Sequence, residues 1–340
     1  MTTYSLLDLA PICEGSDASA AFRNSRDLAQ HAEKWGYHRY WLAEHHNLPG
    51  IGSAATAVLI GDVARATNTL RVGAGGIMLP NHPPLVVAEQ FGTLEALFPG
   101  RIDLAVGRAP GSDAATAKAL RRYFESADSF PQDLAELMSY FEPAKPNQRV
   151  RAIPGEGLRV PIYLLGSSTF SATLAAELGL PFAFASHFAP DYLHLALKIY
   201  RSEFKPSAVL KQPHAMIGAG VYAAETDGEA ERIFSSAQIQ GLNLIRGRPG
   251  KLPPPTDDVH SLWSADERMA IEHRTRYAAV GGPEKVQGKL REIIDETDAD
   301  EIILTAQIFD HSARLRSFEI AATLLGEMRS GAKVAGAAVG

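Results

Sequence analysis

The sequence predicts a (β/α)8 barrel, a TIM barrel with insertions after its fourth and seventh strands. Apolar segments of strand length alternate with segments of helical periodicity along the 340 residues. Crossovers of that length join parallel strands, and eight such units close into a barrel. The alternative is an open, doubly wound sheet, which typically carries a GxGxxG turn, but no such motif follows the first predicted strand.

The predicted strands are short apolar runs bounded by turn residues. They cover residues 4–9, 37–42, 70–79, 101–106, 161–165, 182–185, 215–222 and 301–306. The predicted helices cover residues 18–35, 53–66, 85–97, 131–141, 169–178, 190–204, 284–296 and 311–329, and one more opens at residue 226.

Local signals mark several helix ends. Ser53 is the predicted N-cap of the helix that ends at residue 66, and Gly179 ends the predicted helix 169–178. Pro283 stands at the first position of the helix that continues to residue 296, where proline is tolerated. Thr226, followed by Glu229, gives a predicted capping box. These signals place helix boundaries independently of the apolar pattern.

Two stretches interrupt the alternation of strands and helices. Residues 108–130 are predicted to be irregular or partly helical, and residues 236–280 to be one long insertion. The insertion contains RGRPGKLPPPTDD, where consecutive prolines exclude regular structure, and it is either a lid over the barrel mouth or a passive surface loop. Residues 1–330 are predicted to form one domain and residues 331–340 a disordered tail.

The composition is that of a globular cytoplasmic protein, and such a chain is usually an enzyme. Hydrophobic residues make up 46%, and the formal charge of −6 argues against a nucleic-acid or anionic-membrane partner. No apolar run reaches the roughly 18 residues of a membrane span, and the first residues do not resemble a signal peptide. Cys13 is the single cysteine, so no internal disulfide can form.

In this barrel, chemistry is carried by the residues at the carboxyl ends of the strands. The second predicted strand ends at Glu44-His45-His46. Adjacent strand residues point to opposite faces, so both histidines cannot ligate one metal from a regular strand, and we predict no metal. Each histidine either touches a ligand or serves a structural role.

The stretch Gly166-Ser167-Ser168-Thr169-Phe170-Ser171 follows the fifth predicted strand and opens a helix. A helix N-terminus offers free N–H groups and partial positive charge, so the stretch predicts an anion site. An ordinary N-cap would explain one of these hydroxyl residues but not four. Arg108, with Lys118 or Arg121, would add positive charge, although basic residues on a helix more often form a solvated face.

The run Gly73-Ala74-Gly75-Gly76 lies in a buried predicted strand, which glycine weakens. Two explanations remain open: close approach of a flat ring to bare backbone, or a bulge that helps the barrel to curve. A phosphate site together with a bare backbone wall predicts a flat, phosphorylated cofactor, for which FMN is the most economical candidate.

Several motifs occur in order along nearly the whole chain: WLAEHH, LRVGAGGIMLPNHPP, GRIDLAVGRAPG and LLGSSTFSATLAAELGLPFAFASHF. In these motifs the chain resembles the bacterial luciferase-like flavin monooxygenases, and most closely their non-luminescent, single-component members of the MsnO8 type. The resemblance implies a barrel, usually dimeric, in which reduced FMN (FMNH2) from a separate flavin reductase reacts with O2. The resulting flavin C4a-hydroperoxide would oxygenate a small organic substrate.

The resemblance also implies roles for single residues. Gly75 and Gly76 match a non-proline cis peptide beside the flavin ring, and His45 matches a histidine of the active-site wall that could act as acid or base. The phosphate-binding positions of the family match Arg108, Lys118, Gly166, Ser167, Ser168 and Ser171. Gly107 replaces a reactive cysteine and Ser167 a carboxylate, which argues against light emission.

We therefore expect His45 to face the flavin and His46 to face away, held by Glu44 or by backbone. Two alternatives stay open: hydride transfer with F420 or FMN and no oxygen chemistry, and a non-catalytic flavin-binding protein. The apolar predicted helices 53–66 and 85–97 are candidates for a homodimer face.

Overall fold

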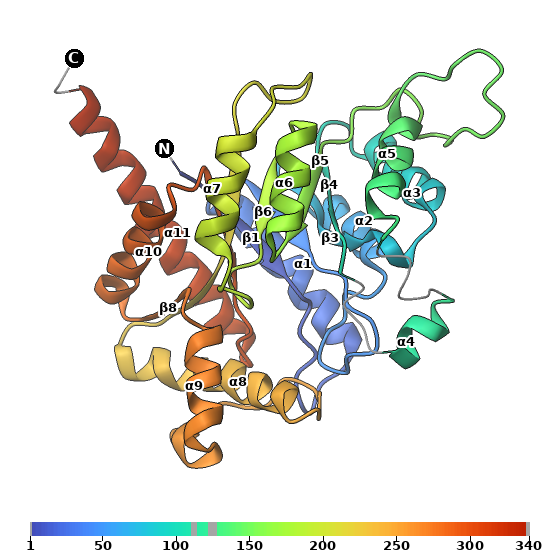
Figure 1. The fold of residues 1–340 in the computed structure, drawn as a ribbon. Coiled ribbons are helices and arrows are strands. Elements are labelled where there is room, and N and C mark those ends of the chain that lie inside the picture. The colour runs from blue at the N-terminus through green and yellow to red at the C-terminus, as the bar shows by residue number, and fades with distance from the viewer. Residues whose placement is uncertain (1, 110–113, 122–127, 338–340) are drawn as a thin grey trace.

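The computed structural model describes residues 2–109, 114–121 and 128–337, and its strands form a closed parallel barrel surrounded by helices (Figure 1). The strand order is β6-β5-β4-β3-β2-β1-β9-β7, and β6 pairs with β7 to close the ring. The predicted (β/α)8 barrel is thus confirmed. The barrel strands are β1 (Thr3–Asp8), β2 (Arg39–Leu42), β3 (Arg71–Met78), β4 (Ile102–Gly107), β5 (Ile162–Gly166), β6 (Phe182–Phe184), β7 (Ala215–Ala223) and β9 (Glu301–Thr305).

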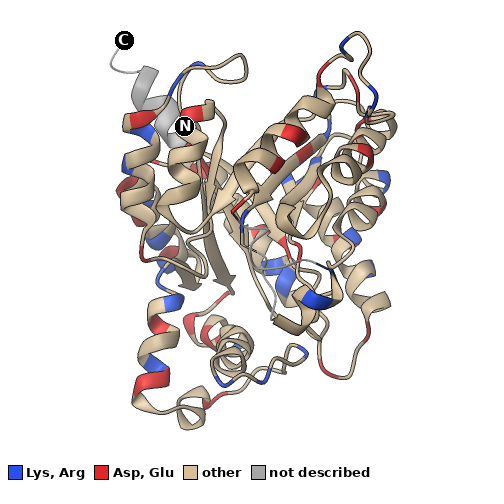
Figure 2. Ribbon diagram, turned by 45° about the vertical axis from the view of Figure 1, so that its right-hand side comes forward, with Lys and Arg blue, Asp and Glu red and all other residues tan. Residues whose placement is uncertain are grey.

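The helices lie outside the barrel, and charged residues of both signs are interspersed along them (Figure 2). They are α1 (Ala18–Lys34), α2 (Thr56–Ala66), α3 (Pro84–Leu97), α4 (Ala114–Ala119), α5 (Phe130–Phe141), α6 (Thr169–Leu178), α7 (Leu193–Glu203), α8 (Asp227–Ile245), α9 (Ala265–Arg274), α10 (Pro283–Thr297) and α11 (His311–Ala337), with 3-10 turns η1 (Leu79–Asn81) and η3 (Val259–Leu262). In the described part of the chain, no helix combines the length and the apolarity that crossing a bilayer requires.

Two predicted helix-end signals, at Gly179 and Pro283, are confirmed, and the predicted capping box at Thr226 is confirmed in one of its two hydrogen bonds. Gly179 ends α6 with a φ of 62°, in the left-handed region that glycine adopts without strain. The Thr226 side chain accepts a hydrogen bond from the Glu229 N–H at the start of α8. Pro283 is the first residue of α10.

Two predicted boundaries differ from the structure. Ser53 does not cap α2, which begins three residues later; its hydroxyl instead donates to the Leu9 carbonyl oxygen at 3.2 Å, at the end of β1. The predicted tail 331–340 is helical as far as Ala337, which agrees with the high helix propensity of its alanines.

The prediction of one long insertion over 236–280 is wrong in its extent. α8 continues to Ile245, and a capping box at Ser264 and Glu267 opens α9. A further strand, β8 (Ala278–Gly281), then pairs with Gly220–Ala223 of β7, beyond the point where β6 pairs. The insertion therefore joins the barrel at the end where the strands terminate (Figure 1).

The proline-rich segment between α8 and η3 is hydrogen-bonded to the loop after β1. Leu252 is 1% exposed; its N–H donates to the Ile12 carbonyl at 2.9 Å, and its carbonyl accepts from the Glu14 N–H at 2.9 Å. The Gln240 side chain of α8 donates to the Gly250 carbonyl at 3.0 Å. The segment is thus anchored across the barrel end, and its movement as a lid stays a prediction.

The core has two apolar layers. The larger one lies between the strands and the helices. The smaller one lies on the other face of the strands and consists of Leu7, Trp41, Ala43, Ala105, Tyr163, Ala183, Met216 and Ile303. Alternation of side chains along each strand separates the two layers.

A charged network lies at the starts of the strands, at the opposite end of the barrel from the insertion. Arg39 donates to Asp103 at 2.7 Å and to both oxygens of Glu301 at 2.8 and 3.1 Å. Burial raises the pKa of Glu301, but the bonds from His214 and Arg39 outweigh it and lower the pKa from 4.5 to about 2. The network thus holds a buried carboxylate in its charged form.

We predict that Glu301 makes the protein sensitive to acid. A lowered pKa stabilises the fold above the ordinary value near 4.5, and this contribution is lost as the pH falls towards about 2. In urea unfolding at pH 7, Glu301→Gln should lower the free energy of unfolding by about 3 kcal/mol, and the difference should shrink between pH 5 and pH 2. The exposed Glu292→Gln is the control; a constant difference across this range would contradict the assignment.

Candidate active site

The expected cis peptide between Gly75 and Gly76 is present in β3. The β3–β4 register also shifts between Gly75 and Ile77, so the bulge explanation holds for this strand. A Cβ on Gly75 would lie 2.8 Å from the Leu7 side chain, and one on Gly76 would lie 2.7 Å from the Ala105 carbonyl oxygen. Barrel packing by itself therefore requires both glycines, and contact with a flat ring stays a prediction.

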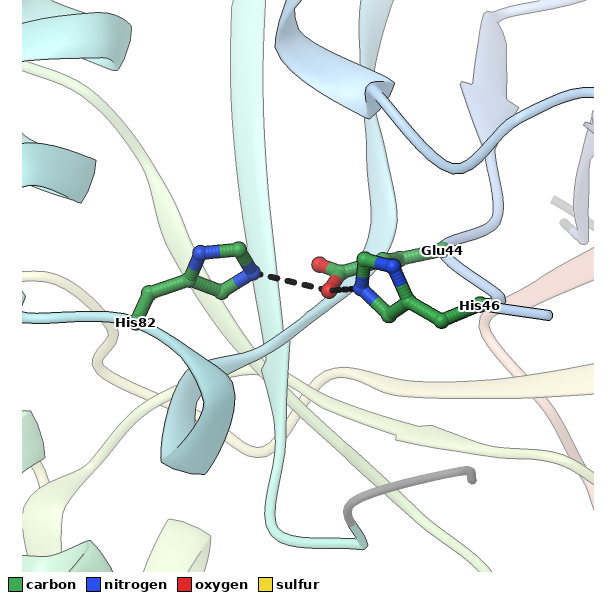
Figure 3. A group of neighbouring side chains, drawn as sticks. All are labelled: Glu44, His46 and His82. Carbon is green, nitrogen blue, oxygen red and sulfur yellow. Dashed lines mark hydrogen bonds and ion pairs between the residues drawn. The ribbon is translucent and has the colours of Figure 1, made fainter. Parts of the chain in front are cut away.

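Glu44 receives two imidazoles on one oxygen (Figure 3). His46 Nε2 lies 2.7 Å and His82 Nε2 lies 2.8 Å from its Oε1, and the Met78 N–H donates to Oε2 at 3.0 Å. An ionised carboxylate only accepts, so each imidazole donates. The predicted partner of His46 is confirmed as Glu44.

These contacts tie the end of β2 to the end of β3. Glu44 is 2% exposed, and burial raises its pKa, but the hydrogen bonds from His46 and His82 outweigh burial and lower it. Ligand atoms of the three side chains lie within 4.8 Å of one another, so they could also hold a divalent cation if the imidazoles gave up these bonds. That no metal binds there stays a prediction.

His45 has a different environment from His46, as the alternation of strand residues predicts. The ring is half-buried and makes no hydrogen bond within the described residues. Burial lowers the pKa of His45 below 6.5, so the imidazole is neutral at neutral pH and able to accept a proton. Its catalytic role stays a prediction.

Arg108 and the serine stretch lie together, as predicted. Gly107 at the end of β4 is level with Leu165 of β5, and the Arg108 guanidinium carbon lies 4.2 Å from the Phe170 ring centroid, in the first turn of α6. A Cβ on Gly166 would lie 2.4 Å from the Ser171 Oγ, so only glycine lets that hydroxyl approach the strand end.

The hydroxyls at this helix start are available for a ligand. Ser168 is the N-cap residue of α6, but its side chain makes no capping hydrogen bond. Ser167 and Ser168 are half-buried and Ser171 is buried. The geometry thus gathers a guanidinium, hydroxyls and helix N–H groups, which suits a phosphate.

Lys118 lies apart from this cluster as far as the described contacts go. It is exposed on the short helix α4, which projects on the side of the molecule where the strands end (Figure 1). Its role in phosphate binding, like that of the other predicted site residues, stays a prediction.

Three residues near these groups were not predicted: His82, His187 and Arg274. His187 follows β6, and a Cβ on Gly218 would lie 2.2 Å from its Nδ1, so the ring packs directly on the β7 backbone. Burial, together with the positive charge of Arg274 and that of His45 when it is protonated, lowers the pKa of His187 to about 4. His82 and His187 were both visible as strand-end residues, but nothing in the sequence signalled Arg274, which ends α9.

A family model described as luciferase-like monooxygenase matches residues 3–301. The chain belongs to the luciferase-like monooxygenase family. A family member of that name from Escherichia coli K12 is 56% identical over 326 residues, covering 96% of this chain and 97% of the relative. The N-acetyl-S-alkylcysteine monooxygenase of Bacillus subtilis 168 is 36% identical over 255 residues, covering 73% and 75%.

Solved structures agree with this family. The crystal structure of apo-MsnO8 superposes with a TM-score of 0.88 at 32% identity, covering 96% of this chain and 99% of that one. Two others, at 17% and 15% identity, share the fold alone: the FMN complex of the oxygenating constituent of 3,6-diketocamphane monooxygenase from Pseudomonas putida, and an F420-dependent secondary alcohol dehydrogenase. Their TM-scores are 0.71 and 0.68, and they cover 94% of this chain and 96% and 97% of their own. Proteins of this fold thus bind either cofactor.

We predict that Glu44 fixes the strand ends. Glu44→Gln would turn an amide NH2 group towards N–H donors, so we expect the free energy of unfolding to fall by about 2–4 kcal/mol in urea at pH 7. Glu177→Gln, on the exposed side of α6, is the matched control and should change it by less than about 0.5 kcal/mol. Equal stability of the two variants would contradict this role.

Proposed function

We propose that the protein is a flavin-dependent monooxygenase that uses reduced FMN and O2 to oxygenate a small organic substrate. The observation that carries the proposal is the Arg108 guanidinium held over Phe170 at the start of α6, beside Ser167, Ser168 and Ser171. Family membership supports the same reaction class.

The donors at this helix start fit the terminal phosphate of FMN. That phosphate is a dianion near neutral pH, and a guanidinium, free hydroxyls and helix N–H groups each favour negative charge. Arg108, Ser167, Ser168 and Ser171 would hold it. When bound and reduced, FMN supplies the two electrons that the activation of O2 requires.

His45 would then act as a general acid or base, transferring a proton to or from an oxygen atom of the substrate. A neutral, half-buried imidazole can accept a proton or pass one on near neutral pH. Glu44, through His46, orients the chain next to it. The anchored segment around Leu252 would limit the entry of water.

The partners belong to the same proposal. A separate flavin reductase would supply reduced FMN, and the protein would work as a cytoplasmic homodimer. Val58 of α2 is 72% exposed and Leu97 of α3 is 64% exposed, and a dimer contact through these helices would cover both.

We predict that the phosphate donors distinguish FMN from riboflavin, which lacks the phosphate. Arg108→Met should weaken FMN binding about 10- to 100-fold and leave riboflavin binding unchanged, and Ser168→Ala should have a smaller effect. Fluorescence titration of both flavins measures this. Arg149→Met, at an exposed arginine, is the control, and Lys118→Met tests whether that side chain contributes. An equal loss for both flavins would place the phosphate elsewhere.

We predict that His45→Gln lowers substrate-dependent oxygen uptake at least 100-fold and leaves FMN affinity within about twofold. N-acetyl-S-methylcysteine is the first substrate to try, because a relative is named for compounds of that type. The exposed His260→Gln is the control. Binding of F420 without oxygen uptake would favour hydride transfer, and FMN binding without any turnover would favour a non-catalytic carrier.

A further inference from the structure

The end of α9 is fixed above the loop that follows β6. His273 Nε2 lies 2.6 Å from Asp191 Oδ1, and the Tyr277 hydroxyl lies 3.1 Å from His194 Nε2. Arg274 stands between these contacts in sequence, and its guanidinium carbon lies 5.6 Å from the Phe188 ring centroid. Contacts on both sides therefore determine where this guanidinium lies.

Arg274 is a sheltered cation without an anionic partner in the described part of the chain. The two arginines that are fully buried in the described structure are both paired: Arg39 with Asp103 and Glu301, and Arg314 with Asp8. Burying a charge is unfavourable unless it is paired, and burial accordingly lowers the pKa of Arg274. The carboxylates near this end of the barrel do not compensate, because Asp191 is bonded to His273 and Glu44 to two imidazoles.

Two imidazoles at this end of the barrel, those of His187 and His45, also make no hydrogen bond within the described residues. His187 Nδ1 is shielded from solvent and finds no hydrogen-bond partner among the described residues. The His187 ring centroid lies 5.6 Å from that of Phe188, the ring on which the Arg274 guanidinium rests, so these two side chains are close together. The positive charge of Arg274, and that of His45 when it is protonated, oppose protonation of His187. An anion beside Arg274 would be attracted by the guanidinium and could accept a hydrogen bond from the neutral imidazole of His187.

We propose that Arg274 binds an anionic group of the substrate, and that this group is a carboxylate. The planar guanidinium offers parallel N–H donors that match a carboxylate in a bidentate pair. Arg274 rests on Phe188, whereas Arg108 of the predicted phosphate site stacks on Phe170 of α6. The inference rests on the proposed function, because it names one feature of the substrate that the monooxygenase accepts.

The test compares acids with their primary amides, which keep the shape but lose the charge. The panel is N-acetyl-S-methylcysteine, butanoate and benzoate, each with its amide, titrated by calorimetry into protein saturated with oxidised FMN. We expect the wild type to prefer an acid over its amide. Arg274→Met should bind the acids about 10- to 100-fold more weakly than the wild type and the amides equally well. Arg274→Lys should have an affinity for the acids between those of Arg274→Met and the wild type.

The matched control is Arg276→Met, which removes an exposed arginine two positions away and should bind like the wild type. Equal acid affinity in Arg274→Met and wild type, or an equal loss for acid and amide, overturns the proposal. The proposal is also overturned if the wild type binds every acid and its amide with equal affinity. Weaker binding of FMN but not of riboflavin in Arg274→Met would assign this arginine to the flavin phosphate instead.

Oxygen uptake with reduced FMN separates this inference from the proposed function. If Arg274→Met keeps uptake with the best amide and loses it with the acid, both stand. If acids bind through Arg274 but no substrate supports uptake, the carboxylate site stands and the monooxygenase assignment fails.

Discussion

The absence of a side chain at Gly73, Gly75 and Gly76 of β3 is the constraint on which the barrel mouth depends. A Cβ on Gly73 would lie 2.4 Å from the Asp103 carbonyl oxygen, and one on Gly75 would meet Leu7 and Trp41. Methyl groups there would force β3 away from its neighbours. Only with these close approaches does the strand deliver the Met78 N–H to Glu44, which in turn holds His46 and His82. The geometry of the candidate site is thus a result of backbone packing inside the barrel.

The arginines of the barrel meet two kinds of partner. Arg39 at the starts of the strands and Arg314 beside the end of β1 are buried and are neutralised by carboxylates. By contrast, Arg108 and Arg274 rest on aromatic rings instead of carboxylates. A guanidinium stacked on a ring keeps its N–H edge free. On the roles proposed above, arginine would serve stability where it is paired with a carboxylate and recognition where it rests on a ring.

The sequence was sufficient to predict the barrel, because strands that alternate with helices pair in parallel irrespective of which side chains make contact. It was also sufficient to bring Arg108 together with the serines of α6, since both follow adjacent strands. His82 stood among the residues after the third predicted strand, but its contact with Glu44 could not be predicted, because it depends on the turn η1. Arg274 could not be predicted as a site residue, because it lies on a helix outside the strand-end rule. The capping residues Ser264 and Glu267 were readable, but the three consecutive prolines before them led to the prediction of irregular structure across the helix that they open.

The pairing of β8 with the far half of β7 leaves the closure of the ring to β6. The inserted elements are therefore attached to the barrel as an added module, through main-chain hydrogen bonds at β8 and Leu252 and side-chain contacts at His273 and Tyr277. Such a module, including Arg274, could be replaced during evolution without disrupting the closure of the barrel. Related enzymes would then diversify what they accept while inheriting the same scaffold.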